Sequence, residues 1–151
     1  MNSFSLEQLI QKLEAYCAYQ ERCLFEIQNK LSQLEANDSD SKIVIAHLSK
    51  NRFFDQNRFA QSFAQGKLRI NKWGKSKIKA ALIQKFVDKS IIIDAISNLD
   101  GEEYKEVLKS LIDRKLRELS KEKDEWAKKQ KILRFLSSRG FEYNEIIRFI
   151  E

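Results

Sequence analysis

Residues 54–59 read Phe54-Asp55-Gln-Asn-Arg-Phe59, and this short stretch decides the fold. An apolar residue, a capping side chain and a second apolar residue that packs back on the first mark the start of a helix. The same pattern occurs at Phe4-Ser5 with Leu9 and at Leu99-Asp100 with Tyr104. The three starts are spaced by about fifty residues, so the pattern predicts three repeated helical units.

A second repeated pattern follows each of these helix starts. It pairs Ile27 with Leu31, Ile78 with Leu82, and Ile132 with Leu136. An apolar pair four residues apart lies on one face of a helix. We therefore predict that the three leucines occupy equivalent buried positions in the second helix of each unit.

The composition indicates an all-α protein. The chain has 151 residues, no proline and four glycines, with 42% hydrophobic and 33% charged residues. A β-sandwich or barrel needs many turn residues, and a phosphate-binding α/β fold needs glycine loops, so both classes are excluded. A helical unit of about fifty residues buries little apolar surface alone, so neighbouring units are expected to share contacts.

The predicted architecture is three tandem three-helix repeats forming an elongated, curved helical array. The repeats are expected at residues 1–50, 51–99 and 100–151. The expected helices lie near 5–19, 22–35, 40–49, 55–70, 75–86, 89–98, 100–122, 124–138 and 142–150.

Several local features accompany this assignment. Gln8 and Glu103 stand where a capping box places its second residue, and Asp88 is positioned to cap the helix at 89–98. Gly74 and Gly140 fall at junctions between helices, where a positive φ is useful. Residues 37–41 are expected to form a loop shaped differently from those of the other units. The phenylalanines between 53 and 86 fall mainly at helical spacing and are expected to be mostly core.

Positive charge is concentrated in the middle of the chain. Residues 42–99 hold twelve basic and three acidic side chains, although the net charge of the whole chain is only +6. The segment 67–79 has six basic residues and no acidic one, which indicates a polyanion or an acidic protein groove as partner. The equally weighted alternative is a lysine-rich helix face kept soluble by its charge. The candidate contact residues are Lys67, Arg69, Lys72, Lys75, Lys77 and Lys79.

Trp73 lies in a bend among these lysines. Covering the bend between two helices is its expected role, and stacking on a nucleic-acid base is the alternative.

Side chains suited to catalysis are scarce, so the chain is predicted not to be an enzyme and to need no metal or organic cofactor. His47 is the single histidine and stands beside an apolar stripe. Cys17 and Cys23 match neither a redox pair nor a zinc half-site, and Cys17 is expected to pack as a small hydrophobe. No apolar run approaches the ~20 residues of a membrane span, and a cytoplasmic monomer with reduced thiols is expected.

The ordered motifs resemble those of the RecX family of RecA regulators. The resemblance rests on Phe54-Asp55-x-x-Arg58-Phe59-Ala60, followed by Trp73-Gly74-x-x-Lys77-Ile78-x-x-x-Leu82. It is extended by Arg22-Cys23-x-x-Glu26-Ile27 in the first unit and by Leu136-x-x-Arg139-Gly140-Phe141 in the third. Two departures are Cys23, where the family commonly has serine, and the 37–41 segment, which lacks the usual glycine.

The resemblance implies a non-enzymatic modulator of homologous recombination and the SOS response. RecX proteins bind the RecA filament in its helical groove and inhibit strand exchange, ATP hydrolysis and co-protease activity. The implied partners are therefore RecA protein and the RecA–DNA filament, with single- or double-stranded DNA as a further partner.

The alternative is an autonomous helical DNA-binding protein or transcriptional regulator. A helix that reads base edges normally carries Arg, Asn or Gln at its exposed start. The helix expected at 75–86 begins instead with Lys75-Ser-Lys-Ile-Lys79, whose lysines suit phosphates better than bases. The sequence thus favours the RecA regulator.

The repeat register makes one prediction about stability. Replacing Leu82 with Ala should lower the free energy of unfolding by about 2–5 kcal/mol, because the truncation leaves a cavity in a packed core. Thermal or urea unfolding would measure the loss. An unchanged melting temperature would contradict the register of the three leucines.

Overall fold

The computed structural model describes residues 3–150, and within this range all regular structure is helical. The helices are α1 (Leu6–Tyr19), α2 (Leu24–Gln33), α3 (Asp38–Lys50), α4 (Gln56–Arg69), α5 (Lys75–Gln84), α6 (Lys89–Ser97), α7 (Gly101–Glu118), α8 (Glu125–Ser138) and α9 (Tyr143–Ile150).

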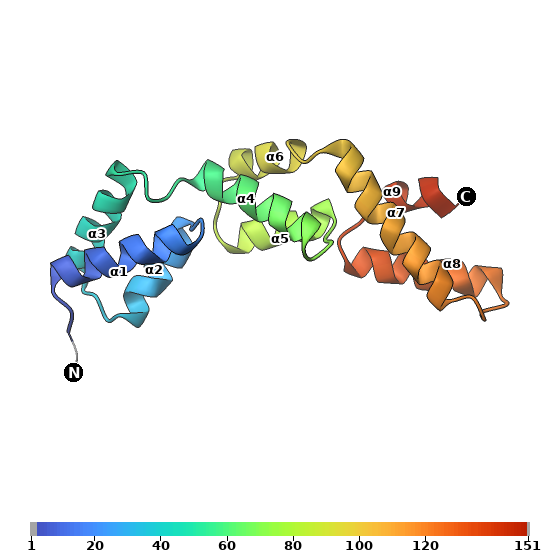
Figure 1. Ribbon diagram of the computed structural model, residues 1–151, viewed down its shortest axis with the longest axis horizontal. Helices are drawn as coiled ribbons and strands as arrows, with labels where there is room; N and C mark the ends of the chain where they lie inside the picture. Colours follow the sequence, from blue (N-terminus) through green and yellow to red (C-terminus); the bar gives the residue numbers. More distant parts are fainter. Residues whose placement is uncertain (1–2, 151) are drawn as a thin grey trace.

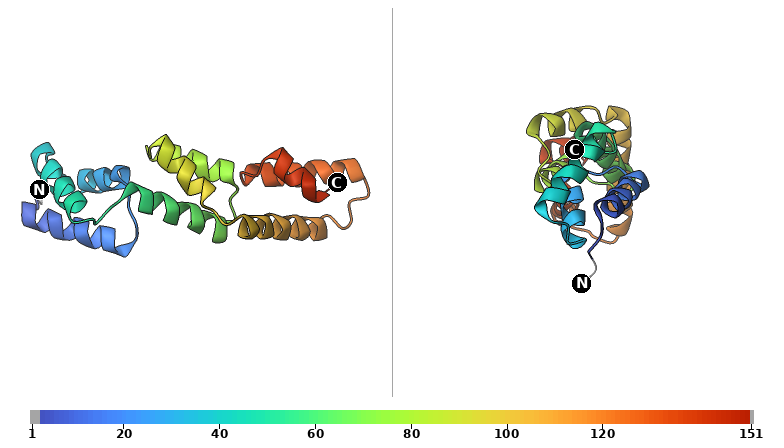
Figure 2. Two further views of the ribbon diagram at one scale, coloured as in Figure 1. Left: turned by 90° about the horizontal axis from the view of Figure 1, so that it is seen from above. Right: turned by 90° about the vertical axis from the view of Figure 1, so that its left-hand side faces the viewer.

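The helices form an elongated array, as the sequence predicted. Figures 1 and 2 show α1–α3, α4–α6 and α7–α9 as three groups that follow one another along the longest axis, with the termini at opposite ends. The middle group lies somewhat higher than its neighbours in Figure 1, which gives the array a shallow arch. We call these groups the first, second and third units. Their boundaries at 50 and 99 remain a prediction.

All three predicted helix starts are present in the structure. Their caps differ from the prediction at one residue. Ser5 and Gln8 form a capping box, and Asp55 accepts a hydrogen bond from the Arg58 backbone N–H. Asp100 accepts from the backbone N–H groups of the first turn of α7. Glu103 does not complete a capping box there, because its carboxylate binds Arg69 of α4 instead.

The second helix of each unit ends in the same way. Leu31, Leu82 and Leu136 are fully buried, and the carbonyl of each accepts a hydrogen bond from the backbone N–H five residues later. The residue just before that N–H has a positive φ in every unit, namely Glu35, Phe86 and Gly140. This is the geometry of a Schellman cap. The predicted register of the three leucines is therefore confirmed.

Other local expectations were also wrong. Residues 38–41 are the first turn of α3, because Asn37 accepts a hydrogen bond from the Asp40 N–H and acidic residues favour a helix N-terminus. Asp88 stands at the N-cap of α6, but its side chain makes no capping hydrogen bond. The helix α7 ends at Glu118, because Leu119 leads into a turn before Asp124 caps α8. Of the phenylalanines between 53 and 86, which were expected to be mostly core, only Phe59 is buried; Phe53, Phe54 and Phe63 are half-buried, and Phe86 is 75% exposed.

The apolar side chains form two separate cores. One core lies within the first unit and includes Leu13, Ile27 and Leu48. The other runs continuously through the second and third units, and it also takes in Cys23 from the start of α2. The segment 90–93, which has high β-propensity, lies in α6 and sends Ile92 into this second core. The tertiary structure thus joins two of the three units into one body.

Gly74 and Gly140 make the close contact on which this joining depends. Gly140 has the expected positive φ of 96°, but Gly74 has a φ of −79°, so its conformation does not require glycine. Space requires it, because a Cβ atom at Gly74 would lie 2.4 Å from the Gly140 carbonyl carbon. The Gly74 N–H donates to the Arg139 carbonyl at 2.7 Å, and the Ser76 N–H donates to the Gly140 carbonyl at 3.1 Å.

Replacing Gly74 with Ala should therefore destabilise the protein by about 1–3 kcal/mol, as overpacking does at other well-packed sites. Urea unfolding would measure the change. Gly66 provides the matched control, because a Cβ atom there meets nothing within 4 Å and the residue lies inside α4. Gly66→Ala should stabilise the protein by about 0.5–1 kcal/mol. Equal effects of the two substitutions would contradict the close approach of the two glycines.

Candidate functional site

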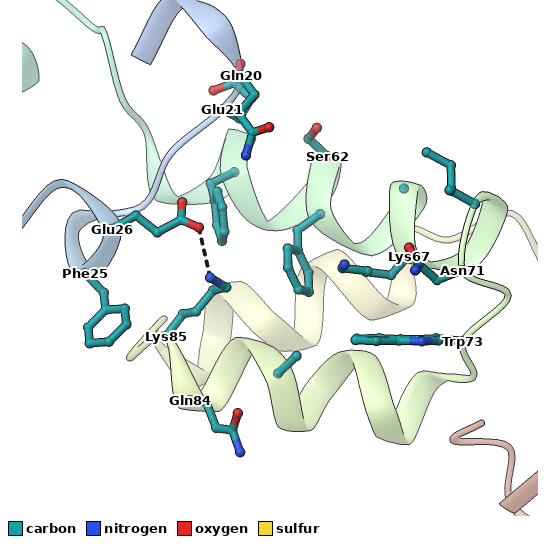
Figure 3. Close-up of a pocket in the computed structure, with 15 residues that line it drawn as sticks. Gln20, Glu21, Phe25, Glu26, Ser62, Lys67, Asn71, Trp73, Gln84 and Lys85 are labelled. Carbon is teal, nitrogen blue, oxygen red and sulfur yellow. Dashed lines mark hydrogen bonds and ion pairs between the residues drawn. The ribbon is translucent and has the colours of Figure 1, made fainter. Parts of the chain in front are cut away.

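A groove of about 720 Å³ lies between the first and second units. Figure 3 shows it, with the loop before α2 on one side and α4 and α5 on the other. Its lining combines aromatic rings, aliphatic groups and lysines. The lining residues are Gln20, Glu21, Phe25, Glu26, Phe59, Ser62, Phe63, Gly66, Lys67, Ile70, Asn71, Trp73, Ala81, Gln84 and Lys85.

Two ion pairs hold the two sides of the groove together. Arg58 of α4 donates to both carboxylate oxygens of Glu21, at 2.8 and 2.9 Å. Lys85 lies 2.9 Å from Glu26, and the other carboxylate oxygen of Glu26 accepts a hydrogen bond from the Cys23 N–H at the start of α2. The ring of Phe25 also packs against that of Phe86, with centroids 5.2 Å apart. Side chains alone thus fix this border, unlike the backbone contacts at the next one.

The groove holds the Lys67 ammonium over two aromatic rings, and Lys77, which is not among the lining residues, approaches one of them. Lys67 lies 4.8 Å from the ring centroid of Trp73 and 5.4 Å from that of Phe63. Lys77 lies 4.7 Å from the Trp73 centroid. Trp73 is half-buried and packs against the core of the second and third units, so it covers the bend between α4 and α5 as expected. Figure 3 shows its ring below Lys67.

The structure separates the six predicted contact residues. Lys67 and Lys77 converge on Trp73, whereas Arg69 points to the third unit and binds Glu103. Lys75 places its ammonium 4.6 Å from the ring centroid of Tyr104 in α7. Lys72 lies in the bend with a φ of 56°, and Lys79 is exposed on α5. The basic run is therefore one segment of sequence that faces several directions.

Most residues of the groove were not predicted from the sequence as contacts, among them Phe25, Ile70 and Lys85. Ile70 directly follows α4 and is 82% exposed. The sequence placed Ile70 inside the helix expected at 55–70, whereas the structure ends α4 at Arg69 and leaves Ile70 as its exposed C-cap. Phe63 was expected in the core, and it is half-buried at the groove instead.

The single histidine and the two cysteines do not line the groove. His47 Nε2 lies 2.8 Å from a Glu14 carboxylate oxygen, and its imidazole stacks on Phe53. Cys17 is buried, as expected for a small apolar side chain, and Cys23 is buried as well. Among residues 3–150, no three side chains of the metal-binding types gather closely enough to hold an ion. No helix in that range is long and apolar enough to cross a bilayer.

Family models of RecX match most of the last two units. The model of the second three-helix domain of RecX matches residues 55–96, and that of the third matches residues 102–150. Two curated relatives are named regulatory protein RecX. The one from Clostridium perfringens is 32% identical over 127 residues, which are 82% of this chain and 59% of the relative. The one from Clostridium acetobutylicum is 36% identical over 124 residues, 80% of this chain and 57% of the relative.

Solved structures share the fold. The crystal structure of RecX from Lactobacillus salivarius superposes with a TM-score of 0.84 at 23% identity, covering 96% of this chain and 94% of that one. A second crystal structure of a regulatory protein RecX gives the same TM-score at 21% identity, covering 96% and 72%. The chain spans about three fifths of the length of the curated relatives it matches.

The burial of the two thiols predicts how the stability of the protein depends on pH. Burial raises the pKa of the Cys17 thiol to about 11 and also raises the pKa of the Cys23 thiol. The stability that the neutral thiols contribute should be complete below pH 9 and should decline as the pH rises toward 11, because the unfolded chain ionises first. Iodoacetamide should label the folded protein slowly at pH 8 and the urea-unfolded protein fast. Rapid labelling of the folded protein would contradict this.

Proposed function

Because the chain belongs to the RecX family, we propose that it is a non-enzymatic regulator that binds RecA filaments and lowers the recombinase, ATPase and co-protease activities of RecA. It acts in the cytoplasm as a monomer and needs no cofactor. Its partners are RecA protein and the RecA–DNA filament. The elongated array supports this proposal, because an extended body can follow the helical groove of a filament over several protomers.

The electrostatics of α5 support an anionic partner for the second unit. The first turns of α4, α5 and α6 lack acidic residues, unlike those of α1, α3 and α7, and the first turn of α5 carries Lys75 and Lys77. Cations near a helix N-terminus are unfavourable, because that end already carries partial positive charge. The Ser76 hydroxyl donates to the Glu142 carboxylate of the third unit at 3.1 Å, and a partner with negative charge would relieve this repulsion further. Lys67, Arg69, Lys72, Lys75, Lys77 and Lys79 are the proposed contacts with RecA or DNA.

The packing of α5 argues against the alternative of an autonomous DNA reader. A recognition helix inserts its N-terminal residues into the major groove. The start of α5 is instead covered by the third unit, since the Lys75 N–H donates to the Tyr104 hydroxyl at 3.0 Å and the Ser76 N–H to the Gly140 carbonyl. This helix cannot enter a DNA groove without separating the two units.

The test is a titration of the purified chain onto RecA filaments formed on single-stranded DNA, with ATP hydrolysis as the readout. The chain should lower the rate of hydrolysis and should bind the filaments more tightly than bare single- or double-stranded DNA. Binding to bare DNA of equal affinity, with no effect on hydrolysis, would favour the autonomous DNA-binding protein.

Salt dependence tests the proposed contacts. Lys72 and Lys79 are the residues to replace first, because Arg69 and Lys75 also contact the third unit. Lys72→Ala with Lys79→Ala should weaken filament inhibition and should reduce the log–log salt slope by about 0.7–0.9 for each phosphate that the variant no longer neutralises. Lys109→Ala with Lys121→Ala is the matched control on exposed positions of the third unit. Equal inhibition and salt slope in both double variants would place the contacts elsewhere.

A further inference from the structure

The groove between the first two units exposes apolar surface at its rim. Ile70 leaves 82% of its surface in solvent beside the half-buried rings of Phe63 and Trp73. An exposed aliphatic group that adjoins aromatic side chains in a concave surface has the composition of a contact centre in a protein interface. The groove therefore fits an apolar side chain of a partner.

The same groove contains the ammonium group of Lys67, which two aromatic rings hold in position. Lys67 lies over the rings of Phe63 and Trp73, and no carboxylate in residues 3–150 pairs with it. The neighbouring cations Arg58 and Lys85 are neutralised by Glu21 and Glu26. The two rings already hold the Lys67 side chain in position. A carboxylate that binds its ammonium group therefore costs little side-chain conformational entropy.

These contacts favour a protein segment over a nucleic acid as the occupant of the groove. A base stacks on the open face of an aromatic ring. The rings of the groove carry ammonium groups instead, with Lys67 and Lys77 over Trp73 and Lys67 over Phe63. A protruding aliphatic group such as Ile70 is likewise suited to an apolar side chain rather than to a phosphate backbone. The observations favour a protein occupant.

We propose that the groove receives a segment of the partner protein in which a large apolar residue adjoins Asp or Glu. The apolar side chain packs against Ile70 and the exposed part of Phe63, while the carboxylate pairs with Lys67. This inference rests on the proposed function, since RecA is the partner that supplies the segment. It places this contact at the border of the first and second units, where the groove lies.

Co-sedimentation with RecA filaments on single-stranded DNA tests the groove. Lys67→Glu combined with Ile70→Ala should reduce affinity by about tenfold or more, as loss of an interface anchor does. The matched control is Lys109→Glu combined with Ile93→Ala, because Lys109 is exposed and Ile93 is 52% exposed, both away from the groove. The control should bind like the parent, and both double variants should keep the parent's melting temperature.

The outcomes separate the two proposals. If the parent neither binds filaments nor lowers ATP hydrolysis, the proposed function fails and this inference falls with it. If the parent binds and the groove variant binds equally well, the inference alone is overturned. If the groove variant loses affinity for bare oligo-dT by the same factor as for filaments, a nucleic acid occupies the groove, and the inference is again overturned.

A photocrosslink identifies the occupant directly. Benzoylphenylalanine introduced at Ile70 should form an adduct with a RecA peptide that contains Asp or Glu beside a large apolar residue, whereas the same group at Ile93 should not. Mass spectrometry of the adduct reads out the peptide. An adduct with DNA, an adduct with a RecA peptide lacking acidic residues, or no adduct from position 70 in filaments that the protein still binds would overturn the proposal.

Discussion

The contact between Gly74 and Gly140 is the constraint on which the arrangement of the second and third units depends. Neither glycine leaves room for a Cβ atom, because such an atom at either position would lie 2.4 Å from an atom of the other unit. This approach brings the carbonyls of Arg139 and Gly140 within hydrogen-bonding distance of the first amides of α5. The third unit therefore caps a helix of the second, which has no capping side chain of its own at Gly74.

The Tyr104 side chain completes this cap and also packs in the core that the second and third units share. Its hydroxyl accepts from the Lys75 N–H, and its ring packs on Phe141. Burial raises the pKa of the Tyr104 phenol, so the group stays neutral where it meets the amide. One aromatic residue thus satisfies a buried polar group and fills the shared core, which explains why the helix start at residues 99–104 matters beyond its own helix.

The border between the first and second units has a different chemistry. The arrangement is otherwise similar, because the start of α2 faces the end of α5 much as the start of α5 faces the end of α8. At this border, however, the contacts are the Glu26–Lys85 and Glu21–Arg58 ion pairs and the Phe25–Phe86 ring pair. Long side chains keep the two backbones apart. The space that they leave is the groove, so the proposed contact surface forms at the junction that lacks the two glycines.

The sequence by itself determined the helical class, the threefold repeat and the equivalent burial of Leu31, Leu82 and Leu136. These properties follow from periodicity and capping, which are local and therefore readable from neighbouring residues. The tertiary structure alone decided that the basic run divides, with Lys67 and Lys77 turning to Trp73 and Arg69 turning to Glu103. It also decided that Gly74 serves close packing and that Ile70 stands open beside a groove. Such facts depend on which unit packs against which, and residues far apart in the chain set that packing.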